Sequence, residues 1–152
     1  MKFVPSIISR RTERGAAAVE FALVSIVFIP LLLAIVGFGH WAYTMEMAAE
    51  ATRTGARIAV VCDLNDTKIW QAVQSRVPQL SLTDAQITVE YFPAGCSKSN
   101  CQGVRVSLSG ASYNSWIPFL PSVMPMPPVT SSLPRESLES TNAAGDVNPV
   151  CI

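Results

Sequence analysis

The sequence is poor in the side chains that catalysis most often uses. It has one histidine, His40, and only 14% of its 152 residues are Asp, Glu, Lys or Arg. It contains no G-x-S-x-G, H-E-x-x-H or GK[ST] phosphate-loop motif, and no G-x-G-x-x-G after a predicted strand. A lone histidine at the edge of an apolar segment makes a catalytic triad or a Cys and His pair hard to assemble. We therefore expect a protein that is not an enzyme and that has no cofactor and no metal site.

Charge is absent from one continuous stretch of the chain. Residues 21–39 carry no formal charge, and Ser25 is the only polar side chain among them. A helix needs roughly 20 predominantly apolar residues to cross about 30 Å of hydrocarbon, so this stretch predicts one membrane span. Glu20 stands directly before it, where a carboxylate is costly enough to need an explanation.

The charges on the two sides of this span differ. Residues 1–14 contain four basic residues and one acidic residue, Glu13. The positive-inside rule therefore predicts a cytoplasmic N-terminus, and it places everything after His40 on the non-cytoplasmic side of the membrane. Trp41 and Tyr43 lie where aromatic residues anchor the outer interface. Because the net charge is zero and no basic stripe with interleaved aromatics follows the span, we expect membrane lipid but no nucleic acid as a partner.

Helical periodicity continues beyond the span. We expect a continuous helix from about Ala16 to about Val61, roughly 70 Å long at about 1.5 Å per residue, with residues 16–39 in the membrane and residues 40–61 outside it. Glu50 and Arg53 are spaced to pair on one face. Small or apolar residues form the other face: Met45, Ala48, Ala49, Thr52, Ala56 and Ala59.

Residues 62–152 predict a small periplasmic domain with mixed secondary structure. A short helix is expected in residues 67–80, with Asp66 or Asn65 as its cap and Pro78 at its end. Residues 85–92 and 103–110 alternate apolar and polar side chains and predict an antiparallel hairpin, with a third strand near residues 129–133. The predicted fold class is α+β: a long N-terminal transmembrane helix, a small antiparallel sheet and one short helix.

Prolines are concentrated in the loop of residues 117–128 and exclude a helix or a central strand there. The favoured interpretation is an irregular connection that covers one face of the sheet with Trp116, Ile117, Phe119 and Leu120. The alternative is a docking surface for a partner.

All four cysteines follow the span, on the side where disulfides persist, and they permit three complete pairings. Cys96 and Cys101 flank the turn-like tetrapeptide SKSN, which favours their pairing and leaves Cys62 for Cys151. The competing interpretation is a zinc site built from these thiols and His40, although the spacings match no standard ligand pattern.

The stretch RGAAAVEF of residues 14–21 resembles a type IV prepilin signal, in which a membrane aspartyl peptidase cuts after the glycine and leaves the apolar helix on the mature protein. Residues 14–61 as a whole are similar to the TadE-like family of Flp, or Tad, pilus systems, and TSSLPRES of residues 130–137 is loosely similar to that family's closing strand. The resemblance implies a leader of residues 1–15, cleavage between Gly15 and Ala16, and a role for Glu20 and Phe21 in signal recognition or assembly.

The resemblance also implies a function. We expect a minor pseudopilin or assembly component of a tight-adherence pilus, whose partners are the prepilin peptidase, other pilins or pseudopilins, and an inner-membrane assembly platform. Its expected location is the inner membrane, or an extracellular pilus into which it is incorporated. The alternative is an uncleaved single-pass protein whose periplasmic domain binds a partner.

Overall fold

A computed structural model describes residues 11–118 and 120–151. The chain divides into two compact units: an N-terminal unit that ends at Phe38 and a C-terminal unit that begins at Gly39. Most of the leader predicted at residues 1–15 lies outside the described residues, which begin at Arg11.

Helix α1 (Arg11–Val61) is the first element of the chain and contributes residues to both units. It ends at the predicted residue and continues through Pro30 as an α-helix. Its start differs from the prediction, because the helix begins at Arg11 and not at about Ala16. Arg and Glu have high helix propensities, which favours helix in residues 11–14.

The short helix of the C-terminal unit, α2 (Thr67–Arg76), forms as predicted. The carboxylate of Asp66 accepts a hydrogen bond from the Lys68 amide at 2.9 Å and so caps its N-terminus. The predicted stop at Pro78 is confirmed, since Pro78 begins a separate 3₁₀ turn, η1 (Pro78–Leu80). Two further 3₁₀ turns follow, η2 (Asp84–Gln86) and η3 (Pro149–Cys151).

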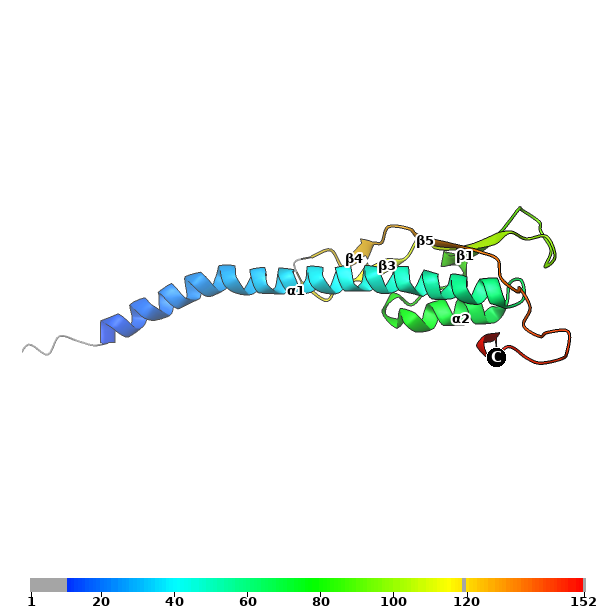
Figure 1. Cartoon of the computed structure of the whole chain (residues 1–152). Coiled ribbons are helices and arrows are strands. Elements are labelled where there is room, and N and C mark those ends of the chain that lie inside the picture. The colour runs from blue at the N-terminus through cyan, green and yellow to red at the C-terminus, as the bar shows by residue number, and fades with distance from the viewer. Residues whose placement is uncertain (1–10, 119, 152) are drawn as a thin grey trace, which may run out of the picture. The chain divides into compact units, whose positions relative to one another are not determined.

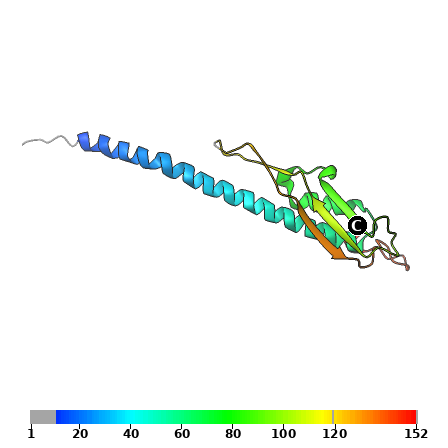
Figure 2. The same ribbon diagram turned by 90° about the horizontal axis from the view of Figure 1, so that it is seen from above.

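The predicted three-stranded sheet is confirmed. Strands β1 (Ile87–Phe92), β2 (Gly103–Leu108) and β5 (Val129–Pro134) are antiparallel in the order β1-β2-β5, with β2 in the centre. Figure 1 labels β1 and β5, and Figure 2 shows β2 between them. Val89 lies opposite Val106 in the register, and Val104 opposite Leu133. On the other face Glu90 lies opposite Arg105, and their side chains approach to 3.7 Å. The alternation of apolar and polar residues therefore separates a buried face from a solvated one.

The buried face of the sheet packs against α2 and the part of α1 that belongs to the C-terminal unit. Gly55 lies where the three elements meet: a Cβ atom added there would be 2.6 Å from Cγ2 of Val73 and 3.4 Å from Cγ1 of Val106. The core contains residues from both helices and the sheet: Ala48, Ala51, Ala56, Ala59, Ile69, Val73, Ile87, Val104, Val106 and Leu108. The small residues of α1 thus allow the helix backbone to approach both neighbours closely.

The proline-rich segment differs from the prediction. It contributes strand β4 (Val123–Pro125), which pairs with β3 (Ser112–Asn114) in a second, two-stranded sheet. A two-stranded sheet has only edge strands, which tolerate proline because the missing amide hydrogen can face away from the ladder. Ile117 is buried and Leu120 half-buried, but Trp116 is 59% exposed and does not cover the larger sheet, and Phe119 lies outside the described residues.

The four cysteines form the two favoured disulfides, Cys62–Cys151 and Cys96–Cys101. The first joins residues 89 positions apart and attaches the C-terminal segment to the residue after α1. The second closes the loop between β1 and β2. All four thiols that the alternative zinc site would use are therefore paired in disulfides.

Replacing Gly55 with Ala should destabilise the C-terminal unit. The added methyl group overpacks the junction with Val73, at a cost of about 1–3 kcal/mol that the better helix propensity of Ala only partly offsets. Gly39→Ala is the matched control, because a Cβ there meets nothing within 4 Å and should leave stability equal or higher. Chemical unfolding in detergent micelles measures both, and equal free energies of unfolding for the two variants would contradict this packing.

The two disulfides should contribute unequally to stability. Loop-closure entropy predicts a loss of about 4–5 kcal/mol for Cys62→Ala with Cys151→Ala, and of about 2 kcal/mol for Cys96→Ala with Cys101→Ala, because the closed loops span 89 and 5 positions. Thermal unfolding of the full chain, followed by near-ultraviolet circular dichroism, tests the order. A larger loss for the Cys96 and Cys101 pair would show that the long loop is held closed by other contacts.

Candidate functional site

The N-terminal unit presents an apolar surface that no described part of that unit covers. Of the described residues, only those of α1 form a helix long and apolar enough to cross a membrane. Its large apolar side chains are 45–75% exposed: Val19, Phe21, Leu23, Val24, Ile26, Val27, Phe28, Ile29, Leu31, Leu32, Ile35, Val36 and Phe38. Soluble monomers rarely expose a contiguous apolar patch of this extent, so the chain is membrane-anchored through α1.

The predicted cleavage and assembly residues all lie on the first turns of this surface. Gly15, Ala16, Glu20 and Phe21 are exposed, and a Cβ atom added at Gly15 would meet nothing within 4 Å. Ala16 and Glu20 are four residues apart on a helix and therefore share one face. Among the described residues no ion pair to the Glu20 carboxylate is present. The carboxylate is thus available to a partner outside the described part of the chain.

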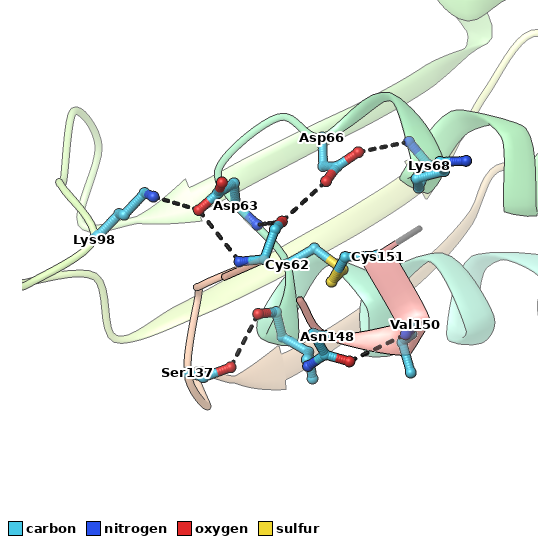
Figure 3. Close-up of a disulfide and its surroundings, with 11 residues drawn as sticks. Cys62, Asp63, Asp66, Lys68, Lys98, Ser137, Asn148, Val150 and Cys151 are labelled. Carbon is cyan, nitrogen blue, oxygen red and sulfur yellow. Dashed lines mark hydrogen bonds and ion pairs between the residues drawn. A yellow bond between two sulfur atoms is a disulfide. The ribbon is translucent and has the colours of Figure 1, made fainter. Parts of the chain in front are cut away.

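The other end of α1 is held by the C-terminal segment, through hydrogen bonds that compensate the last carbonyl groups of the helix. The Val60 carbonyl accepts hydrogen bonds from the Glu136 and Leu138 amides, both at 3.2 Å. The Val61 carbonyl accepts from the Glu139 amide at 2.8 Å. It also accepts from the Ser137 hydroxyl at 2.9 Å (Figure 3). These carbonyls have no partner within the helix, so the segment replaces water at the helix end. We call residues 136–140 the clasp.

A polar cluster around Asp63 joins the clasp to the turn after α1 and to the loop between β1 and β2 (Figure 3). The Asp63 amide donates to the Ser140 hydroxyl at 2.9 Å, and that hydroxyl donates to Asp66 at 3.1 Å. The ammonium group of Lys98 forms an ion pair with the Asp63 carboxylate. This hydrogen bond from Lys98 lowers the pKa of Asp63 below its usual 3.8. The cluster is partly exposed and serves to join segments that are distant in sequence.

Burial also affects one titratable group of β1. The hydroxyl of Tyr91 accepts a hydrogen bond from the Asn65 amide at 3.1 Å, beside the turn that follows α1. Burial raises the pKa of this hydroxyl above its usual 10.0, because the phenolate would lose hydration. Tyr91 therefore stays neutral at physiological pH and joins β1 to the same turn.

His40 is hydrogen-bonded to a tyrosine of the smaller sheet. Its Nδ1 atom lies 2.7 Å from the hydroxyl of Tyr113 on β3, and the two rings are 5.5 Å apart. Tyr113 is 3% exposed, so the imidazole supplies the hydrogen bond that a buried hydroxyl needs. Within the described residues no group of three His, Cys, Asp or Glu is placed to hold a metal ion.

Sequence reasoning missed the clasp and the partner of His40. Ser137, Leu138 and Ser140 follow the closing strand in a polar stretch with no periodicity, so nothing local indicated that they meet residues 74 or more positions earlier. Leu138 could have been noticed as an apolar residue in polar surroundings, and it is 1% exposed. Tyr113 carried no signal, because its partner is 73 positions away.

Comparison with known proteins gives one match. The family model described as TadE-like protein matches residues 15–57, which confirms the predicted resemblance for the part of α1 that contains Gly15, Ala16, Glu20 and Phe21. Neither the curated proteins nor the solved structures gave a match. The clasp and the sheets lie outside the matched residues.

Proposed function

From the TadE-like match of residues 15–57, we propose that the chain is a minor pseudopilin or assembly component of a Tad pilus system. It is inserted through residues 21–39, cut after Gly15 by a prepilin peptidase, and packed against other pilins by the helix that first served as its membrane anchor. The match to the family is the observation that carries the proposal, and the exposed apolar surface of α1 supports it.

The energetics of the helix are consistent with storage in the membrane. Burying each large apolar side chain is worth about 1.5–3 kcal/mol, and thirteen of them are exposed between Val19 and Phe38. One charged side chain at the centre of a membrane helix costs about 2.5–3.5 kcal/mol on insertion scales, and less near the interface. Glu20 therefore does not prevent insertion. It leaves one carboxylate at the cytoplasmic edge whose interactions can change after cleavage.

Cleavage supplies the partner for that carboxylate. A cut after Gly15 creates an ammonium group on Ala16, and an ammonium from a neighbouring subunit can pair with Glu20 where water is scarce. Ala16, Ala17 and Ala18 have small side chains, which allow two helices to approach closely at this level. Phe21 is 75% exposed beside them and offers apolar contact area to the same neighbour. The pair would set the axial register of one subunit against the next.

The function we propose is non-catalytic and depends on the orientation of the chain across the membrane. The basic residues of the N-terminal segment hold it in the cytoplasm, where the peptidase cuts and the assembly platform acts, while the C-terminal unit stays in the periplasm. That unit contributes a rigid body: two disulfides, the clasp and the Asp63 cluster connect its segments. It therefore presents a fixed surface to other pilus components while the apolar part of α1 exchanges lipid for protein.

Co-expression with a Tad prepilin peptidase should shorten the chain by residues 1–15 and leave Ala16 as its N-terminus. Intact-mass spectrometry of the membrane-extracted protein measures this directly. Gly15→Val should abolish the cut, because the type IV prepilin signal that residues 14–21 resemble is cut after a glycine. The open space around Gly15 leaves the helix intact.

Gly39→Val is the matched control, because its Cβ also meets nothing within 4 Å and it lies far from the proposed cut. It should be processed like the wild type. Wild-type protein that retains residues 1–14 in the presence of an active peptidase would favour the uncleaved single-pass alternative.

Glu20→Gln should be cleaved normally but should assemble poorly with other pilins. A neutral amide cannot pair with the Ala16 ammonium, and a loss of about 1.4 kcal/mol per contact lowers association about tenfold. Quantitative cross-linking of cleaved subunits in membranes measures this association. Glu46→Gln removes an exposed carboxylate of the same helix outside residues 21–39 and should have no effect. Equal assembly of Glu20→Gln and wild type would remove the proposed role of this residue.

A further inference from the structure

The hairpin of β3 and β4 ends in a loop that the proposed pilus function does not use. We call the described residues of this loop, 115–118 and 120–123, the hairpin tip. The register pairs Tyr113 with Met124 and Asn114 with Val123, and the Ser115 amide donates to the Ser122 carbonyl at 2.9 Å. The tip therefore starts directly beyond Tyr113, the residue that contacts His40.

Contacts along α1 locate the tip at one end of the C-terminal unit. Lys98, in the loop between β1 and β2, contacts Asp63 just after α1 ends, whereas Tyr113 contacts His40 at the start of the unit. The chain between Lys98 and Tyr113 thus runs antiparallel to α1, and the tip continues in that direction beyond Tyr113 (Figure 2). The tip lies at the end where α1 enters the unit, and residues 21–39, the proposed membrane span, end at that point in the sequence.

The surface of the tip is apolar and uncharged. Trp116 is 59% and Val123 54% exposed, while the buried side chain of Ile117 anchors the loop. No Asp, Glu, Lys, Arg or His occurs between Arg105 and Arg135 in the sequence. Moving the tip out of water would therefore require no dehydration of a formal charge, which is the largest cost of entering a membrane.

The backbone of the tip is also suited to low water activity. The Ile117 amide donates to the Ser115 hydroxyl at 3.2 Å, and the Leu120 amide donates to the Ile117 carbonyl at 3.2 Å. Pro118 and Pro121 have no amide hydrogen to satisfy. Irregular backbone is excluded from lipid because its unpaired amide groups would lose their hydrogen bonds to water. In the tip, several backbone amides are paired internally, and the two prolines have no amide hydrogen.

We propose that the hairpin tip inserts into the outer headgroup region of the lipid bilayer as a second membrane contact. Trp116 is the main anchor, because tryptophan prefers the interface between lipid and water. Tyr43, which follows His40 on α1 and is 55% exposed, is a second aromatic residue suited to that interface. This inference rests on the membrane placement of residues 21–39 but not on the pilus function.

The chemistry favours lipid over a protein as the occupant. Protein interfaces surround an apolar centre with a polar rim and often use Arg as an anchor. The charged residues nearest in sequence, Arg105 and Arg135, instead belong to β2 and the end of the larger sheet: Arg105 pairs with Glu90, and Arg135 donates to the Lys98 carbonyl at 2.9 Å. With no basic residue at the tip, binding should need no anionic lipid and should depend little on salt.

To test this, the wild-type chain is reconstituted in phosphatidylcholine vesicles. Some of the phosphatidylcholine carries a photoreactive diazirine near the headgroup end of its acyl chain. Because there is no Lys or Arg between Arg105 and Arg135, trypsin releases the whole hairpin as one peptide, residues 106–135. Mass spectrometry should find lipid adducts in that peptide and in residues 15–53, which contain the span, but not in residues 69–76 of α2.

Two pairs of substitutions give a matched comparison. Trp116→Ser with Val123→Ser should lower the labelling of residues 106–135 and leave that of residues 15–53 unchanged. Val147→Ser with Val150→Ser, which alters side chains 53% and 52% exposed elsewhere on the unit, should change neither.

The outcomes separate this inference from the membrane placement on which it rests. Labelling of residues 15–53 without residues 106–135 would overturn the inference and leave the span in place. Labelling of neither peptide would overturn both. If lipid is the occupant, residues 106–135 should keep their lipid adducts when other pilins are added. A hairpin that cross-links to pilins but never to lipid would overturn the inference and identify a protein surface.

Discussion

The close approach of α1 to its neighbours is the contact on which the rest of the C-terminal unit depends. Gly55 has no side chain at the point where α1, α2 and β2 meet, and Ala48, Ala51, Ala56 and Ala59 are completely buried beside it. Small residues let larger ones such as Val73 and Val106 fill the remaining space from the other elements. Interiors are close-packed, so an added methyl group has no room unless an element moves.

One helix carries two kinds of surface, and the change between them explains its composition. Up to Phe38 the large apolar side chains are exposed, as suits a lipid or a neighbouring helix. From Gly39 onward small residues face a core and charged residues such as Glu50 and Arg53 face water, where they form an ion pair at 3.4 Å. The helical backbone is continuous through both patterns, so one element both anchors the chain in the membrane and packs in the core of the C-terminal unit.

The end of α1 is closed by parts of the chain that come much later. The clasp supplies donors to the last carbonyls, Cys151 bonds to Cys62, and the loop between β1 and β2 reaches the same turn through Lys98. A helix end without such partners leaves carbonyls that only water can satisfy. The proposed division of roles follows from this arrangement, with a rigid C-terminal unit attached to a helix whose first part can exchange partners.

Periodicity and composition determined the elements that depend on neighbours in sequence: the span, the end of α1 at Val61, the Asp66 cap, and the hairpin of β1 and β2 with its Cys96–Cys101 bridge. The signal motif likewise pointed to the family that residues 15–57 match. Only the tertiary structure decided how β3 pairs with β4, that Trp116 stays exposed, that His40 contacts Tyr113, and that the clasp covers Val60 and Val61. The contacts among them join residues up to 78 positions apart in the sequence. They form only when distant segments are brought together by folding, so no local sequence pattern predicts them.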